Sequence, residues 1–114
     1  MIIYVDGSGG PRGGFGYYAE DGSSRYEERP GITSNQAEYL AVIAALEGRA
    51  GQRGLVICSD SQVTVNQLNH KYAINSRQLR DLARQAWSLM AEVPGVEIRW
   101  VPRGENPAGK MMGS

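Results

Sequence analysis

Three carboxylates in this chain stand where predicted strands and helices end or begin. Asp6 and Asp60 each close a short apolar run that is typical of a buried strand, and Glu38 lies in the first turn of an apolar helix. In open α/β sheets, ligands bind at the carboxyl ends of parallel strands, so these side chains can converge there. Converged carboxylates bind hard divalent cations through oxygen. Such clusters drive phosphodiester chemistry through two metals about 4 Å apart.

The elements that must position these residues follow from hydrophobic patterning. The order strand, strand, strand, helix, strand, helices, strand predicts an α/β domain, and Asp21-Gly22 marks a hairpin turn between the second and third strands. The first and fourth strands are expected to be parallel neighbours joined by a crossover. The predicted strands cover residues 1–6, 15–20, 24–29, 55–59 and 96–101.

Capping residues locate the helices. Thr33 with Gln36 fits a capping box, so a helix is expected to begin near Asn35, and its apolar residues on nearly every face predict burial. Ser76 is expected to cap a second long helix, and residues 61–69 a short one. We predict one domain over residues 1–108 and a flexible tail over residues 109–114.

Composition limits the function classes. The 114 residues carry 12 Lys and Arg against 12 Asp and Glu, so the net charge of +0 gives no global field for nucleic acid. Phosphate binding therefore has to be local or bridged by metal ions. No apolar run approaches a membrane span, and the single cysteine, Cys58, excludes an internal disulfide. We expect a cytoplasmic monomer with no membrane contact.

The segments around the three carboxylates resemble the type 1 ribonuclease H family over about residues 1–107. The motifs that carry the resemblance are Asp6-Gly7-Ser8, Thr33-x-Asn35-x-Ala37-Glu38 and Ser59-Asp60-Ser61. The resemblance implies a ribonuclease H-like fold, a five-stranded mixed sheet of order 3-2-1-4-5 flanked by helices. It further implies that Asp6, Glu38 and Asp60 bind two Mg²⁺ ions, for which Mn²⁺ can substitute.

The implied activity is hydrolysis of the RNA strand of RNA–DNA hybrids to 5′-phosphate and 3′-hydroxyl ends. By resemblance, Asn35 and Gln62 reach base edges in the minor groove, and Thr33 helps to hold a DNA phosphate. Arg103 is a candidate for contact with the scissile phosphate, and a solvent-exposed arginine without a substrate role is the alternative. The expected substrate-binding set is Gly7, Ser8, Gly9, Thr33, Ser34, Asn35, Ser61, Gln62 and Arg103.

The chain departs from the family at the fourth carboxylate, which follows an Asn by four residues. Asn106 matches the Asn, but the next step lands on Lys110, which cannot ligate a cation while protonated. We favour Asn106 as a neutral fourth ligand in the catalytic set. Glu105 in its place, or a site of three carboxylates, are the alternatives.

Other parts of the family pattern are absent. The family often places a His after the last strand, whereas the one His here, His70, lies between helices. Residues 70–75 are too short for the basic insertion that grips DNA in many members, and the final helix is expected to be missing. A non-catalytic ribonuclease H-like module that binds nucleic acid or protein is the rival interpretation.

Overall fold

A five-stranded mixed sheet forms the centre of the protein, and the predicted order β3-β2-β1-β4-β5 is confirmed. The computed structural model describes residues 1–49 and 51–111. β1 pairs antiparallel with β2 and parallel with β4, as expected of a strand–helix crossover. The elements are β1 (Ile2–Ser8), β2 (Gly14–Ala19), β3 (Ser24–Glu28), α1 (Ser34–Gly48), β4 (Val56–Ser59), α2 (Gln62–Leu68), α3 (Arg77–Met90), β5 (Glu97–Trp100), the 3₁₀ turn η1 (Arg103–Glu105) and α4 (Pro107–Met111).

β1 runs beyond the predicted end at Asp6, through Gly7 and Ser8. Both residues pair with β2, Gly7 with Phe15 and Ser8 with Gly14. Their small, polar composition is typical of a turn, but the neighbouring strand supplies the backbone partners that keep them extended. The extension holds the segment after Asp6 against the rest of the sheet.

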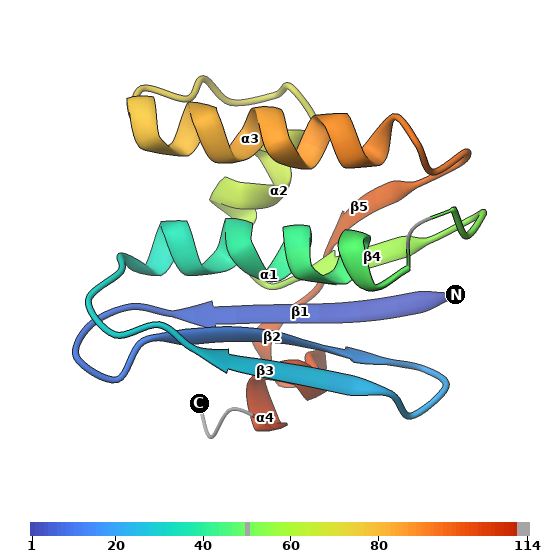
Figure 1. Cartoon of the computed structure of the whole chain (residues 1–114), viewed down its shortest axis with the longest axis horizontal. Coiled ribbons are helices and arrows are strands. Elements are labelled where there is room, and N and C mark those ends of the chain that lie inside the picture. The colour runs from blue at the N-terminus through green and yellow to red at the C-terminus, as the bar shows by residue number, and fades with distance from the viewer. Residues whose placement is uncertain (50, 112–114) are drawn as a thin grey trace.

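α1 lies between the sheet and α3 (Figure 1). Its predicted capping box is present, since the Thr33 side chain accepts from Gln36 N and the Gln36 side chain accepts from Thr33 N. Apolar residues on nearly every face are buried because the helix is covered on two sides. Ala83 and Ala86, both fully buried, allow α3 to approach α1 closely.

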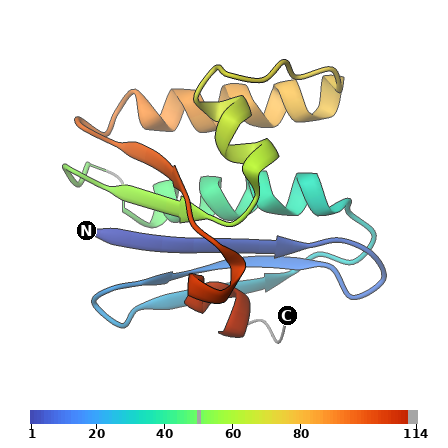
Figure 2. The ribbon, with the colours of Figure 1, turned by 180° about the vertical axis from the view of Figure 1, so that it is seen from behind.

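A short final helix, α4, corrects two expectations. We predicted no helix after the last strand and a flexible tail over residues 109–114, but Gly109 to Met111 belong to α4 and Gly109 is buried. Pro107 begins the helix, where its missing N–H costs nothing, and Ala108 is fully buried. α4 packs on β1 and β2, on the sheet face opposite α1 (Figure 2). Residues 112–114 of the predicted tail lie outside the described residues.

No helix in the described part of the chain is both long and apolar enough to cross a membrane.

Candidate active site

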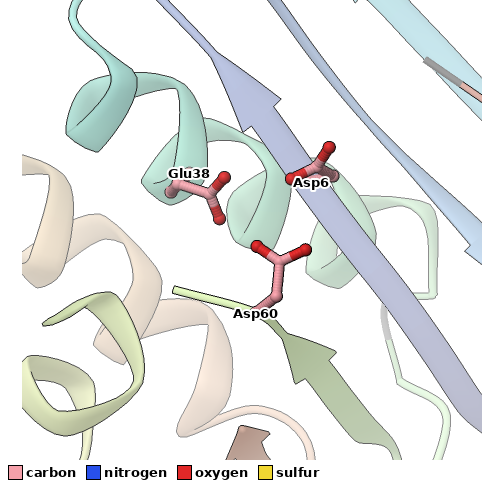
Figure 3. A group of neighbouring side chains, drawn as sticks. All are labelled: Asp6, Glu38 and Asp60. Atoms are coloured by element: carbon pink, nitrogen blue, oxygen red, sulfur yellow. The ribbon is translucent and has the colours of Figure 1, made fainter. Parts of the chain in front are cut away.

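The three predicted carboxylates meet at one edge of the sheet. Asp6 comes from β1, Glu38 from α1 and Asp60 from the residue after β4, and their side chains converge (Figure 3). One oxygen of each carboxylate lies within 4.8 Å of an oxygen of the other two. Asp6 and Glu38 are buried, and all three line a cleft of about 340 Å³. Parallel β1 and β4 end side by side, which places Asp6 and Asp60 together.

Gly7 is required by the close approach of β1 to α1. A Cβ at this position would lie 2.4 Å from the carbonyl carbon of Ala37, so any side chain would push the strand and the helix apart. The contact lets Gly7 N donate to Glu38 Oε1 at 2.9 Å. Gly9 is constrained in the same way, since its Cβ would lie 2.5 Å from Ser34 N. The glycines after Asp6 therefore hold Glu38 beside Asp6.

Glu38 is held at both oxygens. Besides the bond from Gly7, Oε2 accepts from Ser59 Oγ at 3.2 Å, and Ser59 is fully buried. Burial, and then the nearby charge of Asp6, raise the pKa of Glu38 to about 8. In the absence of metal, Glu38 therefore carries a proton at neutral pH. Ser59 was not predicted as a site residue, although its place directly before Asp60 at the end of a strand was the available signal.

The residues present fit a divalent cation. The donor set is made of hard carboxylate oxygens, which are the ligands that Mg²⁺ and Mn²⁺ prefer. A charged Glu38 is unfavourable here without a counter-charge, because burial, and then the charge of Asp6, raise its pKa. A bound cation supplies that counter-charge, so the cluster is suited to metal binding.

Asn106 is fully buried beside the cluster but does not direct its oxygen to it. Its Nδ2 donates to Val5 O at 2.9 Å and to Asp60 Oδ2 at 3.0 Å, and its Oδ1 accepts from Ala108 N at 3.0 Å. The orientation is fixed, since a carbonyl can only accept and a backbone N–H can only donate. The oxygen through which Asn would ligate a cation is thus engaged in capping α4. This geometry argues against the predicted role of Asn106 as fourth ligand.

Glu105, the alternative fourth ligand, is exposed at the end of η1 and does not line the cleft. Lys110 is exposed as well. Among the described residues, the acidic cluster therefore consists of the three predicted carboxylates.

Six of the nine predicted substrate-binding residues line the cleft. Arg103 supplies its one cationic side chain among the residues described. The other three predicted residues do not line the cleft. Gly9 N donates to Ser34 Oγ at 3.3 Å, and Thr33 caps α1. Gln62 is exposed at the start of α2. The predicted residues that line the cleft are Gly7, Ser8, Ser34, Asn35, Ser61 and Arg103.

A mixed sheet in this order, with carboxylates from β1, α1 and the end of β4 converging at its edge, defines a ribonuclease H-like domain. The family model described as reverse transcriptase-like matches residues 21–112. The chain therefore belongs to this family, and its features are those of a short type 1 ribonuclease H.

Relatives and solved structures match most of the chain. The putative hydrolase EbsB of Enterococcus faecalis is 32% identical over 98% of this chain and 90% of its own length. The crystal structure of RNase H1 from Halobacterium salinarum is 29% identical, with a TM-score of 0.81, over 96% of this chain and 91% of that one. That of LC11-RNase H1 in complex with RNA/DNA hybrid is 25% identical, with a TM-score of 0.80, over 99% of both chains. The bifunctional protein Rv2228c of Mycobacterium tuberculosis is longer, and the 28% identical match spans 93% of this chain but 33% of that protein.

Proposed function

We propose that this protein is a metal-dependent endonuclease that hydrolyses the RNA strand of RNA–DNA hybrids to 5′-phosphate and 3′-hydroxyl ends. The observation that carries the proposal is the convergence of Asp6, Glu38 and Asp60 within 4.8 Å in an open cleft. The likeness to LC11-RNase H1, whose structure was solved with an RNA/DNA hybrid, supports the choice of substrate. The protein acts as a monomer in the cytoplasm, where the buried Cys58 stays reduced.

The three carboxylates would hold two Mg²⁺ or Mn²⁺ ions. When bound, such a pair activates a water and stabilises the leaving oxygen of an in-line displacement. Asp6, from β1, would be a ligand of the pair together with Glu38 from α1 and Asp60 from the residue after β4. Gly7 and Ser59 orient Glu38 through hydrogen bonds of 2.9 and 3.2 Å. Glu38 would hold the cations in its deprotonated form, because a carboxylate ligand must be ionised.

The cleft rim recognises the hybrid. Arg103 attracts the phosphate that is to be cut, since it is the cation of the cleft lining. Asn35, in the first turn of α1, offers its amide to base edges in the minor groove, and backbone groups near residues 8–10 and Glu38 contact the 2′-hydroxyls that an RNA strand displays there. Because a DNA strand has no 2′-hydroxyl, these contacts select the RNA strand for cleavage.

One observation favours the rival, a non-catalytic module that binds nucleic acid or protein through the same fold. An exposed Lys110 stands where the family has its fourth carboxylate. The three carboxylates crowded in the cleft favour the nuclease, because such a cluster is unfavourable in a protein that binds no cation. Turnover is the property that separates the two functions.

A cleavage assay with a substrate panel separates the two functions. The RNA of a hybrid, single-stranded RNA and duplex DNA are each labelled and incubated with the protein in Mg²⁺ and, separately, in Mn²⁺. We expect cutting of the hybrid alone in both ions, and none by the Asp60→Asn variant. Equal cutting of single-stranded RNA, or no cutting at any ion concentration, would contradict the proposal.

A further inference from the structure

Asn106 lies beside the carboxylates and connects them to other parts of the chain. It is fully buried, and its side-chain amide bonds to three separate parts of the chain. We infer that Asn106 is a positioning residue, which orients Asp60 for metal binding and ties the metal site to α4. The inference rests on the metal site of the proposed function.

The donor side of the amide spans both strand ends that carry aspartates. Nδ2 has two hydrogens, and the structure gives each an acceptor, Val5 O at 2.9 Å and Asp60 Oδ2 at 3.0 Å. Val5 directly precedes Asp6, so one side chain bonds to the backbone beside Asp6 and to the carboxylate of Asp60. A donor on a carboxylate makes a charge-assisted bond and restricts its rotation. Asp60 is thereby held in one orientation towards the cluster.

The acceptor side of the amide is anchored in α4. Oδ1 accepts from Ala108 N at 3.0 Å, and Ala108 is fully buried where α4 packs on β1 and β2. A helix of five residues has little stability of its own, so it depends on this packing and on its cap. The short helix thus serves as the support that holds the Asn106 amide against Asp60.

Asn69 provides a matched control. Its Nδ2 also donates to a backbone carbonyl, Ile98 O, at 2.9 Å, but it contacts none of the carboxylates and does not line their cleft. Asn69→Ala therefore removes a comparable amide-to-carbonyl bond without touching Asp60. Because Asn69 is exposed and Asn106 is fully buried, Asn69→Ala is expected to cost less stability than Asn106→Ala, and a loss of metal affinity is expected only in Asn106→Ala.

The test measures Mg²⁺ binding by calorimetry in the absence of hybrid. Removing the partner of a metal ligand commonly costs about tenfold or more in affinity, and we expect this for Asn106→Ala. Asn69→Ala is expected to keep wild-type affinity. In the cleavage assay, Asn106→Ala lowers kcat and leaves KM for the hybrid unchanged, because no substrate contact is lost. Wild-type Mg²⁺ affinity in Asn106→Ala would overturn the inference.

Hydrogen exchange at Ala108 N–H distinguishes a positioning residue from a ligand. If Asn106 positions Asp60, this N–H stays protected in the wild type when Mg²⁺ is added. If the amide oxygen turned to the metal, the N–H would lose its acceptor and exchange faster, which would overturn the inference. This readout needs no turnover, so a protein that binds Mg²⁺ but cuts no hybrid would remove the proposed nuclease and leave the role of Asn106 standing.

Asn106→Ser is the second variant, for use if Asn106→Ala does not fold. Serine is a good helix cap, so α4 keeps an acceptor for Ala108 N. Its single hydroxyl hydrogen cannot serve both Val5 O and Asp60. We expect a folded protein with weakened Mg²⁺ binding. Unchanged Mg²⁺ affinity in this variant, or no Mg²⁺ binding by the wild type, would contradict the inference.

Discussion

Gly7 N donates a 2.9 Å hydrogen bond to Oε1 of Glu38, which joins the end of β1 to α1. The bond is possible because residue 7 has no side chain. A Cβ there would lie 2.4 Å from the carbonyl carbon of Ala37 and would separate the two elements. The position of Glu38 next to Asp6 is therefore set by a glycine and not only by the carboxylates themselves.

Gly7→Ala is expected to destabilise the protein by about 1–3 kcal/mol, the usual cost of overpacking, and to reduce cleavage because Glu38 is displaced. Gly104→Ala is the control, since a Cβ at Gly104 would meet nothing within 4 Å. Chemical denaturation and the hybrid cleavage assay measure both effects. A Gly7→Ala protein as stable and as active as the Gly104→Ala protein would show that this contact does not constrain the site.

The stability of the metal-free protein is expected to depend on pH through Glu38. Burial and the neighbouring Asp6 raise its pKa in the folded protein from 4.5 to about 8. Between these values the folded state holds a proton that the unfolded state has released. The free energy of unfolding therefore falls as pH rises through this window, by ~1.4 kcal/mol per pH unit for one group. Denaturation series of the wild type and Glu38→Gln check this, because the variant lacks this contribution.

Equal slopes of unfolding free energy against pH for the two proteins across the window would mean that Glu38 does not titrate there.

Mg²⁺ binding is expected to depend on the same Glu38 proton. Since a cation must displace it, Mg²⁺ affinity is expected to rise with pH up to about 8. Calorimetry in buffers of different ionisation enthalpy counts the protons released, and Glu38→Gln is expected to release fewer.

Neutralising any one carboxylate is expected to separate activity from stability. Asp6→Asn and Asp60→Asn each remove a charge, and Glu38→Gln removes a carboxyl group that is protonated at neutral pH without metal, all with little change in shape. Each is expected to abolish measurable cleavage. Thermal stability in metal-free buffer is expected to stay equal or rise, because the Asp variants relieve like-charge repulsion and Glu38→Gln removes the proton uptake that accompanies folding. Near-wild-type turnover by one variant would remove that residue from the catalytic set.

Hybrid binding is expected to be weak and to fall steeply with salt. The chain has a net charge of +0, and Arg103 is the cation of the cleft lining. Arg103→Gln is expected to weaken binding and to lower the salt slope by about one, as the loss of one phosphate contact predicts. Arg99→Gln serves as the control, because Arg99 is exposed on β5 and pairs with Glu97 at 3.0 Å. Fluorescence anisotropy over a salt series measures both, and tight binding at high salt would reveal a further contact surface.

Much of the secondary structure was predicted from local sequence signals. The caps Thr33 and Ser76, the hairpin turn at Gly22 and the apolar runs before Asp6 and Asp60 act within a few residues, so they can be read along the chain. These signals predicted the order of the elements along the chain, whereas the order of the strands in the sheet was implied by the family resemblance. The resemblance, together with the strand-end positions, predicted that the carboxylates converge.

The features that the sequence did not predict depend on contacts between residues that are far apart in the chain. α4 is stabilised by packing on β1 and β2, which no pattern within five residues reveals. Asn106 Nδ2 donates to Val5 O, 101 residues away, and the same NH₂ group donates to Asp60. These bonds orient the amide so that its nitrogen, and not its oxygen, faces the carboxylates. The hydrogen bond from Ser59 to Glu38 likewise joins β4 to α1.

The most direct test of the account is cleavage of one hybrid labelled on both strands, with the wild type and Glu38→Gln compared in Mg²⁺ and in a chelator. We predict that wild type in Mg²⁺ cuts the RNA strand alone and leaves 3′-hydroxyl ends that a polymerase extends. Glu38→Gln, and wild type in chelator, are expected to leave both strands intact. An RNA strand that stays intact in both Mg²⁺ and Mn²⁺, or a DNA strand cut as readily as the RNA, would contradict the account.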